Sequence, residues 1–473
     1  MTTIYALSSG LGKAGVAVIR ISGPQTANAL RQLVGKLPPP RVASLKTLRH
    51  PFNGEVLDRG LVLWFPAPHS FTGEDMAELQ VHGGRAVVEC VLAALGGLDG
   101  LCLAQPGEFT RRAFENGKLD LTSAEGVADL IDAETAVQRR QAIHQSSGAL
   151  QTLYEDWRGE LISALAHVEA ALDFSDEDDV PDTVDTAARP IAKALHSQIS
   201  AHLADGRRGE IIRDGVRVVI AGPPNAGKSS LMNALAQRDV AIVSAQAGTT
   251  RDVIEVRLDL GGVPVILMDT AGLREEAGEI EGEGIRRALQ CAEDADLVLW
   301  LNEAQHFQNG FLCDGTDDLP CEMQGVSRII RVASKLDLIS NAERSNFSVS
   351  HNAAVSGEGT IAASPKFSVT SSTLLPLSVH TGDGMDTLLL CLSNEAAFMV
   401  GSGESAVITR ARHRQELQTC VTALEHFLLG TSVELELRAE DLRQAATALG
   451  RITGRVDVED VLDKIFGDFC IGK

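Results

Sequence analysis

The sequence predicts a multidomain chain with an α+β domain first, a helical bundle second, and an α/β domain inserted in that bundle. Three observations lead to this prediction. The chain has 473 residues, too many for one hydrophobic core. Alternating strand and helix patterns fill its middle, while helical periodicity without strands precedes and follows them. A glycine-rich loop opens the middle part directly after a buried apolar run.

The glycine-rich loop matches the G-x-x-x-x-G-K-[ST] pattern of a phosphate-binding loop. An apolar run at 216–221 predicts the strand before it, and 231–236 predicts the helix after it. Its glycines let backbone N–H groups point at phosphate oxygens, and the helix N-terminus adds positive charge. Lys228 is expected to reach the β- and γ-phosphates and Ser229 to bind Mg²⁺. The motif therefore predicts a P-loop domain in preference to a plain glycine turn.

The charge balance argues against a general nucleic-acid coat. The chain carries 42 basic and 64 acidic residues, a net charge of −22, and only 4% aromatic residues. Phosphate contacts depend mainly on Lys and Arg, and base stacking depends on aromatic side chains. Any contact with RNA is therefore expected to be local, or shared with a more basic partner.

The eight cysteines are scattered and include no C-x-x-C pair. This is typical of reduced thiols and not of a disulfide framework or a zinc site. The sequence also has no run of 18 apolar residues and no signal-peptide pattern. We expect a cytoplasmic protein without membrane insertion.

The patterns divide the chain into an α+β domain at 1–119, helices at 120–213, an α/β domain at 214–398 and helices again at 399–473. In the first domain we expect strands at 3–7, 15–21 and 61–65 and a helix at 25–33. The α/β domain is expected to have a hairpin turn at Gly261-Gly262. Further strands of this domain are expected at 297–301, 329–332 and 375–378, and a helix from 385.

Several polar stretches have local explanations. Those at 70–75 and 106–112 lie among glycines and are interpreted as turns and caps. Residues 122–125 match a capping box that starts the helices, and a further helix is expected at 185–206. The acidic run at 175–179 could bind a cation, but a solvated loop is the commoner meaning. The stretches 303–326 and 338–373, rich in Gly, Ser, Asn and Asp, are interpreted as surface insertions.

Further motifs follow the phosphate loop at the intervals of a GTPase. Thr250 is expected to bind Mg²⁺, Asp269 to lie in the outer shell of that ion, and the Gly272 amide to lie near the γ-phosphate. Asp337, in Ser334-Lys335-Leu336-Asp337, can accept the guanine N1 and N2 hydrogens. Ser378-Val379-His380 follows where a guanine O6 contact is made. This order, with each motif at a strand-to-loop boundary, predicts a GTP site.

These motifs resemble those of the bacterial tRNA modification GTPases of the MnmE (TrmE) family over nearly the whole chain. The resemblance rests on residues 106–121, 222–230, 248–252 and 269–274, and on the C-terminal Cys470-Ile471-Gly472-Lys473. It implies an N-terminal tetrahydrofolate-binding-like domain that also dimerises, a central helical bundle, and a P-loop GTPase domain inserted in the bundle.

The resemblance implies a GTP site with two departures from the family pattern. Ser334 replaces the asparagine of N-K-x-D, and Val379-His380 replaces Ala-Lys or Ala-Arg. The implied GTP-binding residues are Asn225, Ala226, Gly227, Lys228, Ser229, Ser230, Ser244, Ala245, Gln246, Ala247, Gly248, Thr249, Thr250, Asp269, Thr270, Ala271, Gly272, Ser334, Lys335, Leu336, Asp337, Ser378, Val379 and His380. Of these, Ser229 and Thr250 would bind Mg²⁺.

The resemblance also implies an unusual catalytic arrangement. Leu273 stands where small GTPases have a water-positioning glutamine. A K⁺ ion would compensate, bound by Asn225, Ser244, Gln246 and Thr249. The GTPase domains would dimerise, and a glutamate would act through a bridging water. The implied catalytic residues are Lys228, Thr250, Gly272, Glu281 and Cys470.

The N-terminal domain would bind 5-formyl- or 5,10-methylene-tetrahydrofolate by the same resemblance. The implied ligands are Arg20, Glu78, Lys118 and Lys473. Cys470 stands at the family's reactive cysteine, although from composition alone it would be an ordinary semi-buried thiol.

The function implied is that of a potassium-dependent, homodimeric GTPase. With an MnmG (GidA)-type flavoprotein, in a heterotetramer, it would modify C5 of the tRNA wobble uridine U34 with a carboxymethylaminomethyl-type group. One alternative is a GTP-switched, ribosome-type assembly factor, which would bind no folate and would not need Cys470. Another is a folate-dependent aminomethyltransferase with a vestigial nucleotide domain, which the intact Lys228, Ser229 and Thr250 disfavour.

Overall fold

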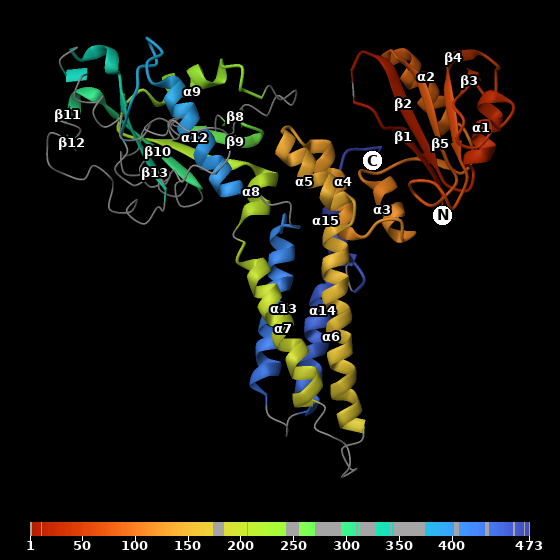
Figure 1. The fold of residues 1–473 in the computed structure, drawn as a ribbon. Helices are drawn as coiled ribbons and strands as arrows, with labels where there is room; N and C mark the ends of the chain where they lie inside the picture. Colours follow the sequence, from red (N-terminus) through yellow and green to blue (C-terminus); the bar gives the residue numbers. More distant parts are fainter. Residues whose placement is uncertain are drawn as a thin grey trace, which may run out of the picture. The chain divides into compact units, whose positions relative to one another are not determined.

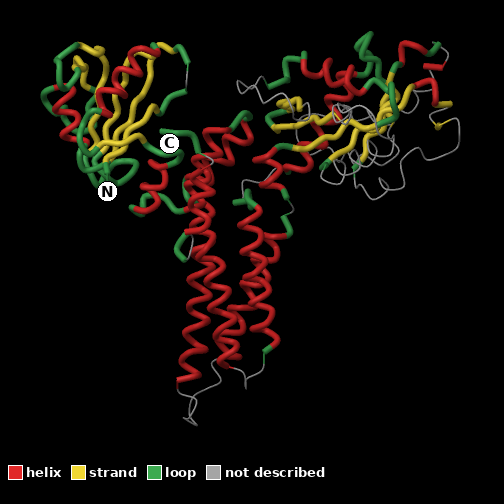
Figure 2. The backbone as a smooth tube through the Cα atoms, turned by 180° about the vertical axis from the view of Figure 1, so that it is seen from behind, coloured by secondary structure: helices red, strands yellow, loops and turns green. Residues whose placement is uncertain are grey.

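The chain forms two compact units, one of which interrupts the other in sequence (Figures 1 and 2). A computed structural model describes residues 2–10, 12–173, 184–205, 207–242, 255–269, 295–308, 311–312, 328–340, 343–344, 374–401, 406–430, 435–456, 459–467 and 469–472. The first unit gathers residues from 1–131, 143–203 and 412–473, and the second gathers residues from 132–142 and 204–411. This confirms the insertion of an α/β part in a helical part. The four domain boundaries remain a prediction.

The N-terminal part of the first unit is a six-stranded sheet with helices on one face. Its elements are β1 (Thr3–Leu7), β2 (Ala14–Ser22), α1 (Thr26–Val34), β3 (Ser44–Arg49), β4 (Val56–Phe65), β5 (Met76–Gly83), α2 (Arg85–Gly96), β6 (Leu101–Leu103) and α3 (Glu108–Glu115). The strand order is β3-β4-β5-β2-β1-β6. Alternate residues such as Ile19 and Leu79 are buried against Leu30 of α1 and Leu95 of α2. The expected strands fall within β1, β2 and β4, and the helix expected at 25–33 is α1, which begins one residue later at Thr26.

The rest of the first unit is helical. Its helices are α4 (Leu121–Asp132), α5 (Ala136–Ser146), α6 (Ala149–Asp173), α7 (Arg189–Leu203), α13 (Ala411–Leu429), α14 (Leu435–Thr453) and α15 (Glu459–Gly467). The long helices α6 and α14 lie side by side, with α7 against α6 (Figures 1 and 2). The helix expected at 185–206 is shorter than predicted, because Val184–Ala188 is a π-helical turn and α7 ends at Leu203.

The predicted capping box at 122–125 is wrong. Helix α4 begins at Leu121, and the Asp120 carboxylate accepts hydrogen bonds from the backbone N–H groups of Thr122 and Ser123, both at 3.0 Å. The Thr122 hydroxyl also donates to Asp120, at 2.6 Å. Because Asp120 already caps these amides, Glu125 is not needed at the helix start.

Glu125 instead forms a buried ionic cluster with the first turn of α13. Its carboxylate accepts from Arg412 Nε at 2.8 Å and pairs with His413 Nε2 at 2.9 Å. Burial by itself raises the pKa of Glu125, but the charges of His413 and Arg412 outweigh it and hold the pKa well below its ordinary value. The cluster joins α4 to α13 across 288 residues of sequence.

The second unit is built on a sheet that is parallel except for one edge strand. Its elements are α8 (Arg208–Asp214), β7 (Val216–Ala221), α9 (Lys228–Ala236), β8 (Glu255–Leu260), β9 (Val263–Asp269), β10 (Leu297–Glu303), β11 (Phe307–Gln308), β12 (Phe311–Leu312), β13 (Ile329–Ser334), β14 (Leu374–Pro376) and α12 (Met385–Val400). The main sheet has the order β14-β13-β10-β7-β9-β8, and β8 is antiparallel to β9. Gly261 and Gly262 form the predicted hairpin turn, at φ 67° and 89°.

One strand of the second unit is shorter than predicted, and the two predicted insertions are described only in part. The strand expected at 375–378 ends at Pro376. Within the expected insertion at 303–326, the short strands β11 and β12 pair with each other. Most of both expected insertions lies outside the described residues.

Replacing Glu125 by Gln tests the buried cluster. We expect a loss of roughly 3 kcal/mol in the free energy of unfolding at pH 7, because buried cations lose their counter-charge. Because the folded-state pKa of Glu125 lies below its ordinary value of 4.5, this stabilisation is present above pH 4.5 and is lost as the pH falls. The gap between wild type and variant, measured by urea unfolding, should therefore narrow in acid.

The matched control is Glu169→Gln. Glu169 pairs with Arg443 at 3.0 Å, but both side chains are 46% exposed. Its replacement should change the unfolding free energy by less than about 1 kcal/mol. Equal losses in the two variants would contradict the role of burial.

Candidate functional site

The phosphate loop joins β7 to α9 as predicted, and close packing requires the first of its glycines, Gly222. A Cβ atom at Gly222 would lie 2.2 Å from the carbonyl oxygen of Leu301 on β10. Asn225 and Gly227 have φ values of 65° and 92°, in the left-handed region that few side chains tolerate. The loop therefore holds a conformation that most sequences could not adopt.

Lys228 and Ser229, at the end of the loop, each form side-chain hydrogen bonds. Lys228 Nζ donates to the carbonyl oxygens of Gly222 and Pro223, both at 2.9 Å. Ser229 Oγ donates to Asp269 Oδ2 at 2.8 Å. A hydroxyl beside a carboxylate is a donor set that suits Mg²⁺. Ser229, which is predicted to bind Mg²⁺, thus lies beside Asp269, which is predicted for the outer shell of that ion.

Ser334 links the phosphate loop to the base-reading motif. Its hydroxyl lies 2.7 Å from the carbonyl oxygen of Ala226 and 3.1 Å from that of Asn302, and the residue is 3% exposed. The side chain therefore faces the protein interior. Its hydroxyl fixes one loop against the other, and the expected contact of Ser334 with the nucleotide stays a prediction.

Asp337, the last residue of the base-reading motif, lies beside Ser378. Ser378 Oγ donates to Asp337 Oδ1 at 2.6 Å, and this hydrogen bond lowers the pKa of the Asp337 carboxyl. An ionised, oriented carboxylate can accept two hydrogens from a guanine edge. His380, the third residue of the predicted Ser378-Val379-His380 motif, is exposed. Its electrostatic interaction with Asp337 also lowers the pKa of that carboxyl.

Glu303 is a site residue that the sequence did not single out. Its carboxylate pairs with Lys335 Nζ at 2.5 Å, and Lys335 is held at a φ of 56°. The available signal was its position, because Glu303 ends β10 at the carboxyl edge of the sheet, where ligands bind in such folds.

Several predicted site residues lie outside the described part of the chain and stay predictions. They are Ser244, Ala245, Gln246, Ala247, Gly248, Thr249, Thr250, Thr270, Ala271, Gly272, Glu281 and Lys473.

In the N-terminal domain, two predicted folate ligands form an ion pair. Arg20 Nη2 lies 3.0 Å from Glu78 Oε1, with the side chains 22% and 20% exposed. The Arg20 guanidinium also lies over two aromatic rings, 5.4 Å from the centroid of Phe71 and 5.7 Å from that of Phe109. The pair is half-buried, and cation–π contacts with the two rings help to hold the Arg20 guanidinium in place.

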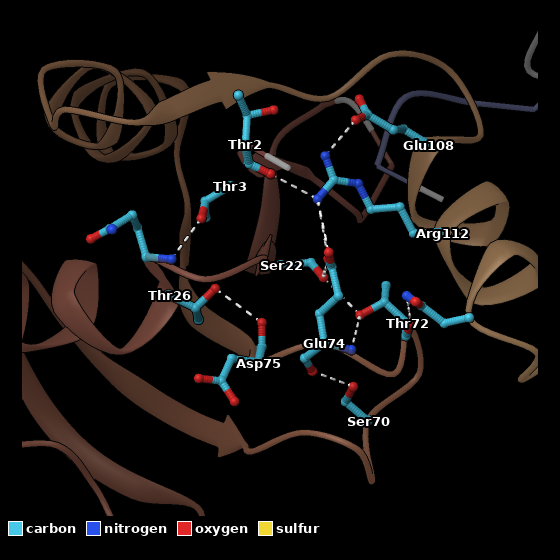
Figure 3. A network of polar contacts seen from close by, with 12 residues as sticks. Thr2, Thr3, Ser22, Thr26, Ser70, Thr72, Glu74, Asp75, Glu108 and Arg112 are labelled. Carbon is cyan, nitrogen blue, oxygen red and sulfur yellow. Dashed lines mark hydrogen bonds and ion pairs between the residues drawn. The ribbon is translucent and has the colours of Figure 1, made fainter.

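The polar stretches at 70–75 and 106–112 bind each other, which the interpretation as turns and caps did not predict, and residues 108–112 belong to helix α3. Figure 3 shows Arg112 at the centre, donating to the Thr2 carbonyl at 2.8 Å, to Glu74 at 3.1 Å and to Glu108 at 2.8 Å. Ser22 Oγ donates to Glu74 at 2.8 Å. The network fixes the loop that carries Phe71 beside Arg20.

Lys118 reaches the same loop from its other side. A Cβ atom at Gly73 would lie 3.1 Å from Lys118 Cε. Arg20 and Lys118 therefore both contact the segment 70–75, although they are almost 100 residues apart in sequence.

The C-terminal tail is bound to the N-terminal domain through its backbone. Ser8 Oγ donates to the carbonyl oxygen of Gly472 at 2.7 Å, and Pro106 forms a bridge with Ile471. A Cβ atom at Gly472 would lie 2.1 Å from the Leu7 carbonyl oxygen, so this close approach requires glycine. Cys470, next to these contacts, is an exposed free thiol.

Other site types find no support among the described residues. The five cysteines in that part of the chain, Cys90, Cys102, Cys391, Cys420 and Cys470, are free. No group of three or more His, Cys, Asp or Glu side chains there could hold a metal ion. Within the same residues, no helix is both long and apolar enough to cross a bilayer.

A phosphate loop at the carboxyl end of β7 in a mainly parallel sheet, with Ser229 on Asp269 and Ser378 on Asp337, is typical of GTP-hydrolysing P-loop proteins. Profiles for the MnmE helical domain and for the GTP-binding protein TrmE N-terminus match residues 121–470 and 3–118, respectively. The chain belongs to the MnmE (TrmE) family of tRNA modification GTPases, which confirms the resemblance and the fold class.

Relatives with this name are similar over the entire chain. The tRNA modification GTPase MnmE of Parvibaculum lavamentivorans is 54% identical over 100% of both chains. That of Rhizobium meliloti is 51% identical over 100% of this chain and 99% of the relative. The rat mitochondrial 5-taurinomethyluridine-[tRNA] synthase subunit GTPB3 is 48% identical over 100% of this chain and 93% of the relative. The chain is thus a GTPase of tRNA modification.

Replacing Ser334 by Ala tests its link to the phosphate loop. The buried Ala226 carbonyl loses its donor, which costs about 1–3 kcal/mol and should weaken GDP binding roughly tenfold. Ser334→Thr keeps the hydroxyl and serves as the control, with affinity expected near wild type. Fluorescent-nucleotide titration measures both. An Ala variant that binds GDP as wild type does would contradict this role.

Proposed function

We propose that this chain is a potassium-dependent GTPase that acts with an MnmG (GidA)-type flavoprotein on tRNA. The two proteins would add a carboxymethylaminomethyl-type group at C5 of the wobble uridine U34. Family membership supports the overall reaction. The observation that carries the proposal is the continuity of the nucleotide site, in which the phosphate loop, Asp269 and Asp337 are tied together by hydrogen bonds of Ser229, Ser334 and Ser378.

Two metal ions are proposed at the phosphate end. Ser229 and Thr250 would hold Mg²⁺, with Asp269 accepting from Ser229 as described. Asn225, Ser244, Gln246 and Thr249 would hold K⁺, which would neutralise charge between the phosphates. Asn225 supports this proposal, because it is an exposed residue of the phosphate loop itself, with a φ of 65°. Its side-chain amide oxygen is therefore available as a ligand. Lys228 would bind the β- and γ-phosphates, with Gly272 and Glu281 completing hydrolysis.

The N-terminal domain is proposed to bind 5-formyl- or 5,10-methylene-tetrahydrofolate. The half-buried Arg20–Glu78 pair supports it, because a guanidinium and a carboxylate can both hydrogen-bond to the polar edge of a pterin ring. Lys118 and Lys473 would meet the acidic tail of the folate. Cys470 is proposed as the reactive thiol of the same domain, since it is exposed beside the bound tail.

The names of two relatives also support a modified uridine as the product and a protein partner. The rat and zebrafish relatives are named subunits of a 5-taurinomethyluridine-[tRNA] synthase, a product substituted at C5 of uridine. We carry the C5 position and the need for a second subunit to this chain. A net charge of −22 agrees with a partner that binds much of the tRNA.

A homodimer is proposed through the N-terminal domain. Leu45 of β3 lies directly opposite Leu61 of β4, and the two are 56% and 38% exposed. Val16 of β2, also on this domain, is 58% exposed. Exposed apolar residues on the sheet face that α1 and α2 leave open suit a second copy. The proposed site of action is the cytoplasm.

Potassium dependence is tested by GTP hydrolysis in K⁺ and in Na⁺ at equal ionic strength. We expect hydrolysis to be at least about tenfold faster in K⁺, because charge neutralisation is worth a few kcal/mol in the transition state. Asn225→Gly should abolish the difference, and glycine accepts the left-handed conformation without strain. Asn233→Ala, an exposed asparagine on α9, is the control. Equal rates in both salts would exclude the potassium mechanism.

Folate binding is tested with Arg20→Ala and 5-formyl-tetrahydrofolate. Loss of a charged hydrogen-bonding group should weaken binding roughly 10- to 100-fold, as measured by calorimetric titration. Arg85→Ala removes a 90% exposed arginine of α2 and should leave the affinity unchanged. Equal affinities for wild type and Arg20→Ala would show that the folate does not use this site.

A further inference from the structure

A short piece of the helical sequence is part of the GTPase unit. Residues 132–142 pack with the second unit, whereas the residues before and after them belong to the first. This piece includes the end of α4 and the beginning of α5. We call residues 134–138 the docking segment.

The docking segment is bound to the tip of the β8–β9 hairpin. Val137 N donates to the Gly262 carbonyl oxygen at 3.2 Å. The Val137 side chain packs against the buried core of the second unit, and a Cβ atom at Gly262 would lie 3.5 Å from Val137 Cγ2. Backbone and side chain of one residue thus hold the hairpin turn.

Two polar contacts extend this attachment. Glu134 Oε2 lies 3.2 Å from Arg257 Nη1 of β8, with side chains 25% and 46% exposed. Gln138 Nε2 donates to the carbonyl oxygen of Arg213, at the end of α8, at 2.8 Å. The segment therefore contacts the hairpin at its turn and along β8, and also the helix that leads into β7.

The hairpin is the element that connects the two predicted switch motifs. β8 begins five residues after Thr250, and β9 ends three residues before Gly272. The Arg257 carbonyl also accepts from Ile242 N at 2.8 Å, so the chain on the other side of the Thr250 loop is fixed to the same strand. A shift of the hairpin must therefore alter where both motifs are held.

We propose that the docking segment is a positioning element for GTP hydrolysis. Glu134 and Val137 hold the β8–β9 hairpin, and the hairpin in turn positions the switch motifs relative to the phosphate loop. Since the segment continues directly into α4 and α5, the same contacts carry nucleotide-dependent changes to those helices. The inference rests on the switch roles proposed for Thr250 and Gly272.

The test uses the full-length chain with the two charges reversed singly and together. In Glu134→Arg and in Arg257→Glu, like charges face each other, and kcat should fall roughly three- to tenfold while GDP affinity stays within about twofold. The swapped pair E134R/R257E should restore kcat, as a double-mutant cycle requires. Hydrogen exchange at 121–146 should differ between GDP and a GTP analogue in the wild type, and not in the single variants.

The control is Arg443→Glu, which reverses one charge of the exposed pair with Glu169 and should change nothing. A kcat within twofold of wild type in both single variants would overturn the proposal, as would a loss that the swap does not restore. Exchange at 121–146 that ignores the nucleotide in the wild type would overturn the transmission to α4 and α5. The rates of all variants are compared in the salt, K⁺ or Na⁺, in which the wild type hydrolyses GTP faster. A failure of the proposed potassium mechanism therefore does not affect this test.

Discussion

The close approach of the phosphate loop to β10 is the constraint on which the nucleotide site depends. Gly222 leaves no room for a side chain against the Leu301 carbonyl, so the loop can lie only where β10 permits. The Ser334 hydroxyl, at the end of the neighbouring strand β13, then fixes the Ala226 carbonyl from the other side. The phosphate and base ends of the site are therefore parts of one hydrogen-bonded structure. A structural change at the phosphate end must therefore also affect the base end, and the reverse.

The insertion of one unit within the other creates a second constraint, because distant segments must close a common helical core. The buried Glu125 meets this need by binding two side chains 287 and 288 residues away. Such an ionic cluster is costly to desolvate and adds little net stability over an apolar contact. Its value is geometric, because the fixed hydrogen-bond directions of Arg412 and His413 set how α13 begins after the inserted unit.

The two ends of the chain are joined in a similar way in the N-terminal domain. The tail carrying Cys470 lies on backbone contacts with Ser8 and Pro106, which are more than 360 residues away. The Arg112 network beside them holds the loop of Phe71 and thus the surroundings of Arg20 (Figure 3). The polar residues of this domain thus serve first to shape a site, and only a few of them are left to contact a ligand.

The sequence by itself determined the elements whose signals are local. The strand, loop and helix around Lys228, the glycine hairpin and the first strands could be predicted because backbone conformation there depends on neighbouring residues. Residues whose roles depend on distant partners could not. The sequence did not indicate that the Ser334 hydroxyl at the end of β13 binds the Ala226 carbonyl, and Glu125 looked like part of a cap until α13 supplied its charges. The docking of Val137 on Gly262 had no local signal either, because tertiary packing alone brings those segments together.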